Sequence, residues 1–232
     1  QIIYYFYAYF KVSKNGEKIN FSVPTGNFGD IYAGYIAKKM GLPIDKLIIA
    51  TNSNDILKRV IESGIYKPLK VQHTISPSMD IQVASNFERL IFDASLHNSD
   101  EVLKLMDNLA KYGEFELEKN ILAKIKESFF SESLTEEETK NIIKETYKNY
   151  KVLIDPHTAV AIGVANKFKS KNKIVVLSTA HPAKFSRVVL SETKIKPELP
   201  ENLKTILVKK EKFEKLPNEL KKIKSYIFNR SR

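Results

Sequence analysis

The chain has 232 residues, of which 43% are hydrophobic and 28% charged, and its formal net charge is +11 at pH 7. It contains no cysteine, which excludes disulfides and thiolate metal sites and fits a reducing cytoplasm. No apolar run approaches the roughly 20 residues that a membrane-spanning helix needs, so we expect no membrane partner. The composition is that of a globular protein large enough to bury a core.

The positive charge raises the question of nucleic-acid binding. The excess is almost entirely lysine, whereas nucleic-acid surfaces usually use arginine forks and stacked aromatic side chains. The lysines are scattered and cluster only late, in residues 208–216 and 219–226. We therefore expect a solvated lysine-rich surface and no nucleic-acid partner. A basic cleft for a phosphorylated small molecule is compatible with the same charge.

The first predicted element is the end of an apolar helix over residues 1–12. The chain opens inside this segment, at Gln1 and without a polar lead-in, which predicts a piece of a longer or trimmed polypeptide. Because many apolar and aromatic side chains of this segment would be exposed, we expect instability, self-association or dependence on an N-terminal partner.

A strand is predicted over residues 19–24 and a helix over residues 28–40. A buried strand at 46–52 follows, and then a helix over 53–64 that Ser53 would cap. The repeated order of strand, turn and helix predicts βαβ units, and therefore an α/β fold whose parallel sheet is flanked by helices.

Residues 76–95 are predicted to form a loop that leads into a helix. Residues 99–150 are charged, helical in pattern and poor in strands, with one predicted helix running over 114–130. Ser133, Thr135 and the acidic residues 136–138 supply a helix start in this stretch. The pattern predicts a helical insertion in the α/β fold.

The last third is predicted to hold a helix opened by Asp155 and Pro156, a strand over 173–179 and a loop over 180–185. A closing helix is predicted over 217–229. We expect four parts. Residues 1–19 are the end of a small domain and a linker, 20–98 form a phosphate-binding α/β domain, 99–151 form a helical insertion, and 152–232 are the remainder of the α/β domain and a C-terminal tail.

The stretch Thr25–Asp30, "TGNFGD", joins the first strand to its helix. Such a turn lies at the carboxyl end of the sheet, where ligands of open α/β folds bind. A helix N-terminus offers unpaired N–H groups to a phosphate, and Gly26 and Gly29 are expected to take positive φ and allow close approach. An ordinary tight turn capped by Asn27 or Asp30 explains the sequence equally well. Asp30 would repel a phosphate, so we expect it to cap or brace the loop.

Four blocks of sequence together resemble threonine synthase, a pyridoxal-phosphate-dependent family that ends threonine biosynthesis. They are "VPTGNFGDIYAGYIAKKMGLPIDKLIIATNSNDIL" (23–57), "SPSMDIQVASNFERLIFD" (76–93), "DPHTAVAIGVA" (155–165) and "LSTAHPAKF" (177–185). The resemblance implies fold type II and a lyase reaction that converts O-phosphohomoserine and water to threonine and phosphate. It also implies pyridoxal 5'-phosphate as cofactor.

The resemblance implies that Gly26, Asn27, Phe28, Gly29 and Asp30 bind the cofactor phosphate. It further implies that Thr179 hydrogen-bonds the pyridine nitrogen. A hydroxyl there, rather than a carboxylate, would leave that nitrogen largely unprotonated and make a milder electron sink. Because Thr179 and the turn each follow a predicted strand, both are expected at the same edge of the sheet.

Other polar residues are weaker candidates. Lys184 and Arg89 are possible ligands of the substrate phosphate, because a phosphorylated substrate needs cations, although a surface role explains each one individually. His73, His97, His157 and His181 lack the spacing of a metal site, and structural hydrogen bonding is expected for the last two. Ser76, Ser78 and Asp80 either line the mouth of a site or simply form a loop.

The chain departs from the family at one point: the S-F-K-D motif with the Schiff-base lysine is absent from these residues. No catalytic residue is therefore identified, and we expect the chain alone to be inactive. It would be the C-terminal portion of an intact enzyme or one half of a split gene with a separate N-terminal fragment. The alternatives are a non-catalytic remnant or interaction module, and another fold-type II lyase such as threonine dehydratase, against which "SPSMDI" and "NFER" argue.

Overall fold

In the computed structural model, which describes residues 1–231, the chain divides into two units, Gln1–Pro197 and Glu198–Arg232. The first unit is built on a four-stranded sheet with the order β5-β2-β1-β6, in which every neighbouring pair is parallel. The strands are β1 (Ile19–Pro24), β2 (Ile44–Thr51), β5 (Phe129–Ser133) and β6 (Ile174–Val176). This sheet confirms the prediction of an α/β fold with a parallel sheet.

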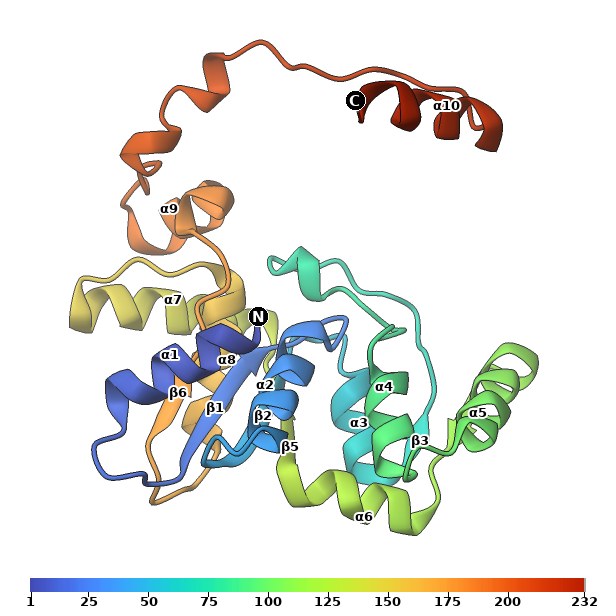
Figure 1. Ribbon diagram of the computed structural model, residues 1–232. Helices are drawn as coiled ribbons and strands as arrows, with labels where there is room; N and C mark the ends of the chain where they lie inside the picture. The colour runs from blue at the N-terminus through green and yellow to red at the C-terminus, as the bar shows by residue number, and fades with distance from the viewer. Residues whose placement is uncertain (232) are drawn as a thin grey trace. The chain divides into compact units, whose positions relative to one another are not determined.

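Helices cover both faces of the sheet (Figure 1). Those packed on one face are α1 (Ile2–Val12), α2 (Gly29–Lys39), α3 (Ile56–Ser63), α4 (Phe87–Ala94) and α6 (Lys119–Ser128). Those on the other side are α8 (Pro156–Lys167), which lies on the strands, and α7 (Glu136–Tyr150) and α9 (Ser186–Thr193), which pack beyond it. The remaining elements of this unit are the helix α5 (Ser99–Tyr112), the short turns η1 (Pro77–Met79) and η2 (Pro182–Phe185), and the antiparallel pair β3 (Ile65–Tyr66) and β4 (Phe115–Glu116).

The alternation of side chains along the strands creates these two layers. Phe21 and Val23 of β1 are fully buried in the core under α2, whereas Ser22 points the other way. Ser22 Oγ donates a hydrogen bond of 2.7 Å to the carbonyl of Ala161 in α8. Ile48 of β2 joins the α8 side of the core. Both faces are therefore covered, which is the usual state of a parallel sheet.

Helix α1 packs on α2 through a close contact of Tyr5 with Gly34. A Cβ at Gly34 would lie only 2.4 Å from a ring carbon of Tyr5, so a larger residue there would push the helices apart. The opposite face of α1 is exposed and apolar. It consists of Ile3, Tyr4, Tyr7 and Phe10, each more than 60% exposed.

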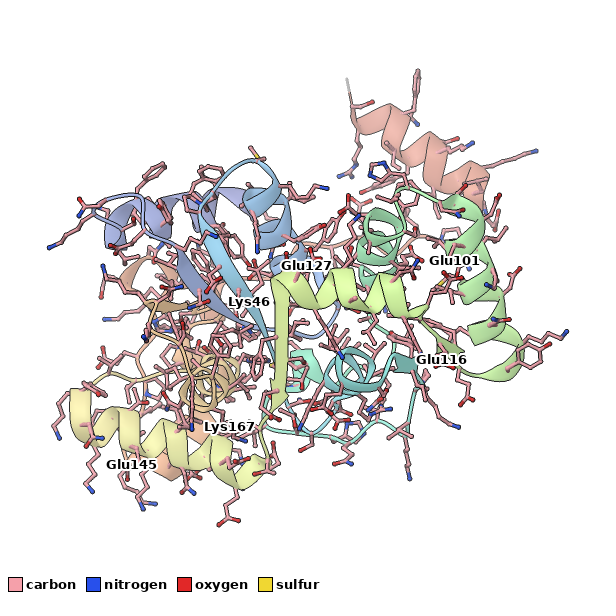
Figure 2. All side chains as sticks on the ribbon, turned by 90° about the horizontal axis from the view of Figure 1, so that it is seen from below. Lys46, Glu101, Glu116, Glu127, Glu145 and Lys167 are labelled. Atoms are coloured by element: carbon pink, nitrogen blue, oxygen red, sulfur yellow. The ribbon has the colours of Figure 1, made fainter. Side chains whose placement is uncertain are left out.

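The prediction of one helix over residues 114–130 is wrong at both ends, and at its start residues 115–116 form β4, which pairs with β3. Helix α6 stops at Ser128, and the next five residues form β5, which pairs with β2. Lys46 Nζ donates to the carbonyl of Glu127 just before β5, and Lys167 Nζ donates to the carbonyl of Ser133 at its end, so two lysines flank this strand (Figure 2). The helical stretch therefore contributes an edge strand to the main sheet.

Two smaller predictions also need correction. Ser53 does not cap α3, which begins at Ile56 after Asp55. Strand β6 ends at Val176, so Thr179 lies in the segment beyond the strand rather than at its last position.

The second unit contains the turns η3 (Glu201–Leu203) and η4 (Ile206–Val208) and the helix α10 (Leu220–Arg230). An ion pair joins Arg230 of α10 to Glu214. The closing helix expected near the C-terminus is thus confirmed. Across residues 1–231, none of the helices combines the length and the apolar character needed to cross a membrane.

Candidate functional site

The turn between β1 and α2 is shaped by Phe28. This residue has φ 68° and ψ 6°, a left-handed conformation that non-glycine residues seldom adopt. Its ring is buried between Phe87 and Phe129, with centroid distances of 5.4 and 5.6 Å, and this packing offsets the backbone strain. The expectation of positive φ at Gly26 and Gly29 is wrong, because Phe28 makes the left-handed step between them.

Gly26 serves close packing instead. A Cβ there would lie 2.7 Å from the carbonyl oxygen of Ser78, so the turn and η1 meet backbone to backbone. At Gly29 the nearest atom to such a Cβ would be Nδ2 of Asn86, at 3.4 Å, which is ordinary contact. The two glycines of the motif therefore have different roles.

The N-terminus of α2 is uncapped. No side chain accepts a hydrogen bond from it, so neither Asn27 nor Asp30 acts as the cap. Within residues 1–231, the backbone N–H groups of residues 26–31 find no hydrogen-bond acceptor. These donors lie at the positive end of the helix dipole, and a left-handed residue beside right-handed ones directs successive N–H groups into one concavity. The arrangement suits an anion.

Asp30 braces the turn against α1, which agrees with one of the two roles expected for it. The hydroxyl of Tyr5 donates to the Asp30 carbonyl at 2.8 Å and to its carboxylate Oδ1 at 3.4 Å. Burial raises the pKa of the Asp30 carboxyl, while the hydrogen bond from Tyr5 lowers it to a smaller extent.

A pocket of about 280 Å³ opens in front of the turn. It is lined by Gln1, Pro24, Thr25, Gly26, Asn27, Phe28, Gly29, Asp30, Ile31, Ser78, Met79, His157 and Thr179. The structure therefore brings together all five residues of the "GNFGD" motif and Thr179. The sequence did not predict Gln1 and Met79 as residues of this site, and it predicted only structural hydrogen bonding for His157.

The sheet explains why Thr179 reaches this pocket. β6 runs parallel to β1, with Val176 opposite Ser22, and the N–H of Leu177 donates to the Ser22 carbonyl at 3.0 Å. Residues that follow β6 therefore emerge beside those that follow β1. β1 is also where the strand order reverses, since β2 lies on one side of it and β6 on the other. Ligands of open α/β sheets bind at such a switch point.

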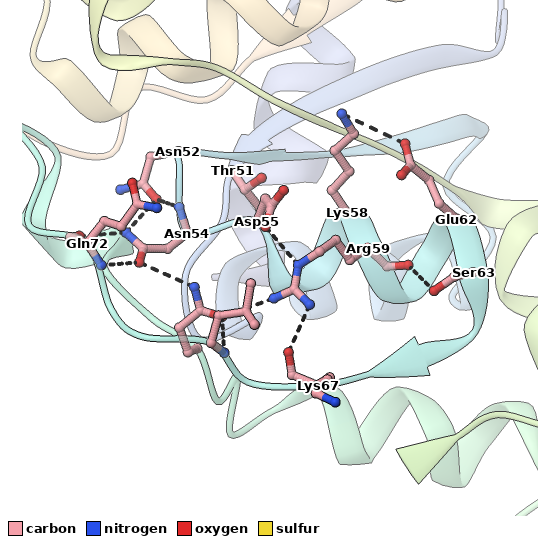
Figure 3. Close-up of polar contacts among 12 residues, drawn as sticks. Thr51, Asn52, Asn54, Asp55, Lys58, Arg59, Glu62, Ser63, Lys67 and Gln72 are labelled. Carbon is pink, nitrogen blue, oxygen red and sulfur yellow. Dashed lines mark hydrogen bonds and ion pairs between the residues drawn. The ribbon is translucent and has the colours of Figure 1, made fainter. Parts of the chain in front are cut away.

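A polar network beyond β2 holds the loop that carries Ser78, and Figure 3 shows the part of it that Asn54 and Arg59 form. The side-chain amide of Asn54 makes two hydrogen bonds with the backbone of Gln72: its Oδ1 accepts from the N–H at 2.9 Å, and its Nδ2 donates to the carbonyl at 2.8 Å. Arg59 of α3 donates to the carbonyl of Lys67 at 2.8 Å. Asp80 accepts hydrogen bonds from Asn52, Asn54 and Thr74. Loop 67–82 is thus fastened at several points.

The two candidate cations do not line this pocket. Arg89 lies on α4 and borders a separate groove of about 640 Å³, together with Tyr32, Phe92 and other residues of α2, α4 and α5. Lys184 lies in η2, is exposed, and its Nζ is 5.5 Å from the centroid of the Phe185 ring. In the described part of the chain, no group of three or more histidine or acidic side chains converges as metal ligands would.

The parallel sheet flanked by helices is the architecture of fold-type II pyridoxal-phosphate enzymes, and solved structures of that class match the chain. A crystal structure of pyridoxal-phosphate-bound threonine synthase from Brucella melitensis matches 100% of this chain and 50% of its own, with a TM-score of 0.91 and 44% identity. Threonine synthase from yeast matches 98% of this chain and 50% of its own, with a TM-score of 0.84 and 38% identity.

The sequence comparisons identify the particular family. A family model for the C-terminal part of threonine synthase matches residues 158–227. The curated threonine synthase of Pseudomonas aeruginosa is 40% identical over 230 residues, which cover 98% of this chain and 49% of that protein. The Saccharomyces cerevisiae enzyme is 42% identical, over 91% of this chain and 47% of its own length. The chain belongs to the threonine synthase family, and it spans about half the length of the curated relatives it matches.

Proposed function

We propose that the chain is the C-terminal portion of a pyridoxal-phosphate-dependent threonine synthase, which converts O-phosphohomoserine and water to threonine and phosphate. The observation that carries this proposal is that the uncapped start of α2 and Thr179 line the same pocket. The cytoplasm is the compartment that suits the absence of cysteine.

In this proposal, the backbone N–H groups of Gly26 to Gly29 hold the cofactor phosphate. The support is that these donors find no acceptor within the described chain and lie at the positive end of a helix. Asp30 would contribute its backbone N–H, while its carboxylate accepts a hydrogen bond from the hydroxyl of Tyr5 at 3.4 Å.

Thr179 is proposed to face the pyridine nitrogen. Its side chain is exposed and forms no hydrogen bond within residues 1–231, so the hydroxyl is available to a ligand. When bound, the cofactor supplies the electron sink for elimination and replacement chemistry. A neutral hydroxyl beside its nitrogen keeps that sink milder than a carboxylate would.

The lysine that holds the cofactor aldehyde in this family has no counterpart motif in these 232 residues. We therefore propose that a polypeptide limited to them binds the cofactor phosphate without turning over substrate. A partner that carries the lysine would complete the site. Phosphate release from O-phosphohomoserine tests this point, and measurable turnover by these residues alone would refute it.

The binding proposal is tested by titrating pyridoxal 5'-phosphate into the chain and into Gly29→Val. Gly29 lines the pocket, and a Cβ there would meet nothing closer than Asn86 Nδ2 at 3.4 Å, so we expect the added side chain to crowd the ligand more than the packing. We expect weaker binding by at least tenfold, the order of effect when one or two charge-assisted hydrogen bonds are lost.

Ala110→Val is the matched control for this titration. It adds a β-branched side chain to an exposed position of α5, far in sequence from the turn. The control is expected to bind as the unaltered chain does. Equal affinity of Gly29→Val and the unaltered chain would rule out the turn as the phosphate site.

A further inference from the structure

The carboxylate of Asp155 lies at the centre of a hydrogen-bond network behind the pocket. It is fully buried at the start of α8. Oδ1 accepts from the backbone N–H groups of His157 and Thr158, at 2.9 and 3.4 Å, and from His157 Nδ1 at 2.9 Å. Oδ2 accepts from the hydroxyl of Thr158. The carboxylate therefore caps the helix and also holds two side chains.

One arm of this network runs through His157 to η1. Because Nδ1 of His157 faces the carboxylate, that nitrogen carries the proton, and Nε2 presents a lone pair. The N–H of Ser78 donates to Nε2 at 3.3 Å. The carbonyl of Ser78 in turn packs against Gly26 of the turn. His157 thus supports the wall on which the phosphate turn rests.

The other arm runs through Thr158 to the Thr179 segment. A hydrogen bond of 3.2 Å joins Thr158 Oγ1 to Ser178 Oγ. Ser178 directly precedes Thr179, which lines the pocket. Thr158 is 4% exposed, so this contact is held by a buried hydroxyl on a rigid helix. The position of Thr179 is therefore tied to the same carboxylate as the position of η1.

We propose that Asp155 is a positioning residue that acts through His157 and Thr158 to set the distance between the two walls of the pocket. The proposal rests on the proposed function in so far as the pocket holds pyridoxal 5'-phosphate. One wall then fixes the phosphate and the other fixes the ring. An isolated helix cap needs neither full burial nor side-chain partners on both oxygens.

The protonation of Asp155 agrees with this role. Burial raises the pKa of its carboxyl, but the hydrogen bonds from His157 and Thr158 outweigh that effect, and the pKa lies below its ordinary value. The carboxylate is therefore charged at neutral pH. Charge-assisted hydrogen bonds are stronger and better defined than neutral ones, which suits a fixed spacing.

Two variants of the 232-residue chain distinguish the two arms of the network, and for each we measure the affinity for pyridoxal 5'-phosphate and for inorganic phosphate. Thr158→Val keeps the side-chain volume but removes the hydroxyl that reaches Ser178. We expect it to weaken pyridoxal 5'-phosphate binding about tenfold, the lower end of effects seen when supporting hydrogen bonds of a metal site are removed. Binding of inorganic phosphate, which needs only the turn, is expected to change less than about twofold.

His157→Phe cuts the other arm while it keeps a ring beside Phe185, whose centroid lies 4.8 Å from that of His157. Because η1 supports the turn, this variant is expected to weaken both probes, each about tenfold. Asp155→Asn combines the two effects. Thr139→Val is the matched control: Thr139 is a buried helix threonine whose hydroxyl donates to Thr135, and both affinities should be unchanged.

Two ligand-free readouts keep this inference separate from the proposed function. Amide exchange at Ser78 is expected to accelerate in His157→Phe, and imidazole nitrogen NMR should show the Nδ1-protonated form of His157 lost in Asp155→Asn. If the unaltered chain binds neither probe, the proposed function fails and these readouts still test the network. Two results would contradict the proposal and leave Asp155 as a helix cap only. One is that Thr158→Val lowers the affinities for pyridoxal 5'-phosphate and inorganic phosphate equally, or lowers neither. The other is that amide exchange at Ser78 is unchanged in His157→Phe.

Discussion

The starts of α2 and α8 border the same pocket, and they are built in opposite ways. At α8, Asp155 accepts from two backbone N–H groups and Pro156 has no N–H to satisfy, so the helix start is closed. At α2, no side chain caps the helix, and the backbone donors of residues 26–31 are left without an acceptor in the described chain.

The difference shows how a chain reserves a helix start for a ligand. Closing the N-terminal donors with a side chain is the usual solution, and α7 follows it through a capping box of Thr135 and Glu138. At α2 the left-handed Phe28 takes the place of a capping residue, and its ring is used for packing instead. Uncapped donors cost stability, so a ligand gains what the missing cap would have supplied.

The largest expected effect concerns Phe28. Removing its ring in Phe28→Ala should lower the free energy of unfolding by about 3–5 kcal/mol, because the side chain is buried between two aromatic rings. Phe28→Gly should be about 1 kcal/mol more stable than Phe28→Ala, since only glycine adopts the left-handed conformation freely. Urea denaturation measures both, and an alanine variant more stable than the glycine variant would contradict the left-handed turn.

A smaller effect should separate the two glycines of the turn. Gly26→Ala places a Cβ 2.7 Å from the carbonyl oxygen of Ser78 and should cost about 1–3 kcal/mol. Gly29→Ala meets nothing closer than 3.4 Å at a position of ordinary φ, so its stability should stay within about 0.5 kcal/mol. Thermal unfolding of the pair checks the contrast, and similar melting temperatures would show that η1 does not pack on Gly26.

The capped start of α7 provides the opposite case. Thr135→Ala removes the side chain that accepts from the N–H of Glu138 and should lower stability by about 1 kcal/mol. Phosphate binding should not change, because this helix start is not part of the pocket. Denaturant titration combined with phosphate titration tests both halves of the expectation. A loss of phosphate affinity would mean that the cap of α7 affects phosphate binding at the start of α2, contrary to this expectation.

The smallest effect is a pH dependence at the same capping box. Hydrogen bonds from Lys167 and from Thr135 lower the pKa of Glu138 from its ordinary 4.5 to about 2. The folded-state pKa is the lower one, so the carboxylate stabilises the fold above about pH 4.5 and loses this effect as the pH falls towards 2.

Because Glu138 is more than a third exposed, its contribution should stay below about 1 kcal/mol and shrink in high salt. Stability measured against pH for the unaltered chain and for Glu138→Gln isolates it. Parallel curves between pH 5 and pH 2 would mean that the hydrogen bonds from Lys167 and Thr135 to this carboxylate contribute nothing measurable to stability.

Much of this fold can be predicted from local sequence. The apolar runs of β1 and β2 and the amphipathic helices between them follow period rules, and the caps at Thr135 and Asp155 are visible as short motifs. Strand β5 is not predicted, because Phe129 and Phe130 continue the helical pattern of α6 and Ser133 resembles a helix cap; only the pairing with β2 makes these residues a strand.

The site is less accessible to such reasoning. Placing Thr179 beside the turn required only that both follow parallel strands, and the pocket agrees with that prediction. The left-handed Phe28 could not be foreseen, because its strain is offset by Phe87 and Phe129, which are distant in sequence. The separation of Arg89 from the pocket likewise depends on how α4 and α5 pack, and no local motif encodes that.

The position of β6 in the sheet has a consequence for the order of folding. Its neighbourhood is joined to β1 by contacts such as that of Asn20 with Ser170, 150 residues apart in the sequence. Closing so long a loop is entropically costly and slow, and on a ribosome β1 would wait for about 150 further residues before gaining this partner. The glycine turn and α2 can form early with β2, whereas Thr179 arrives with β6. The pocket is thus expected to mature only after β6 has been made, well after the glycine turn itself can form.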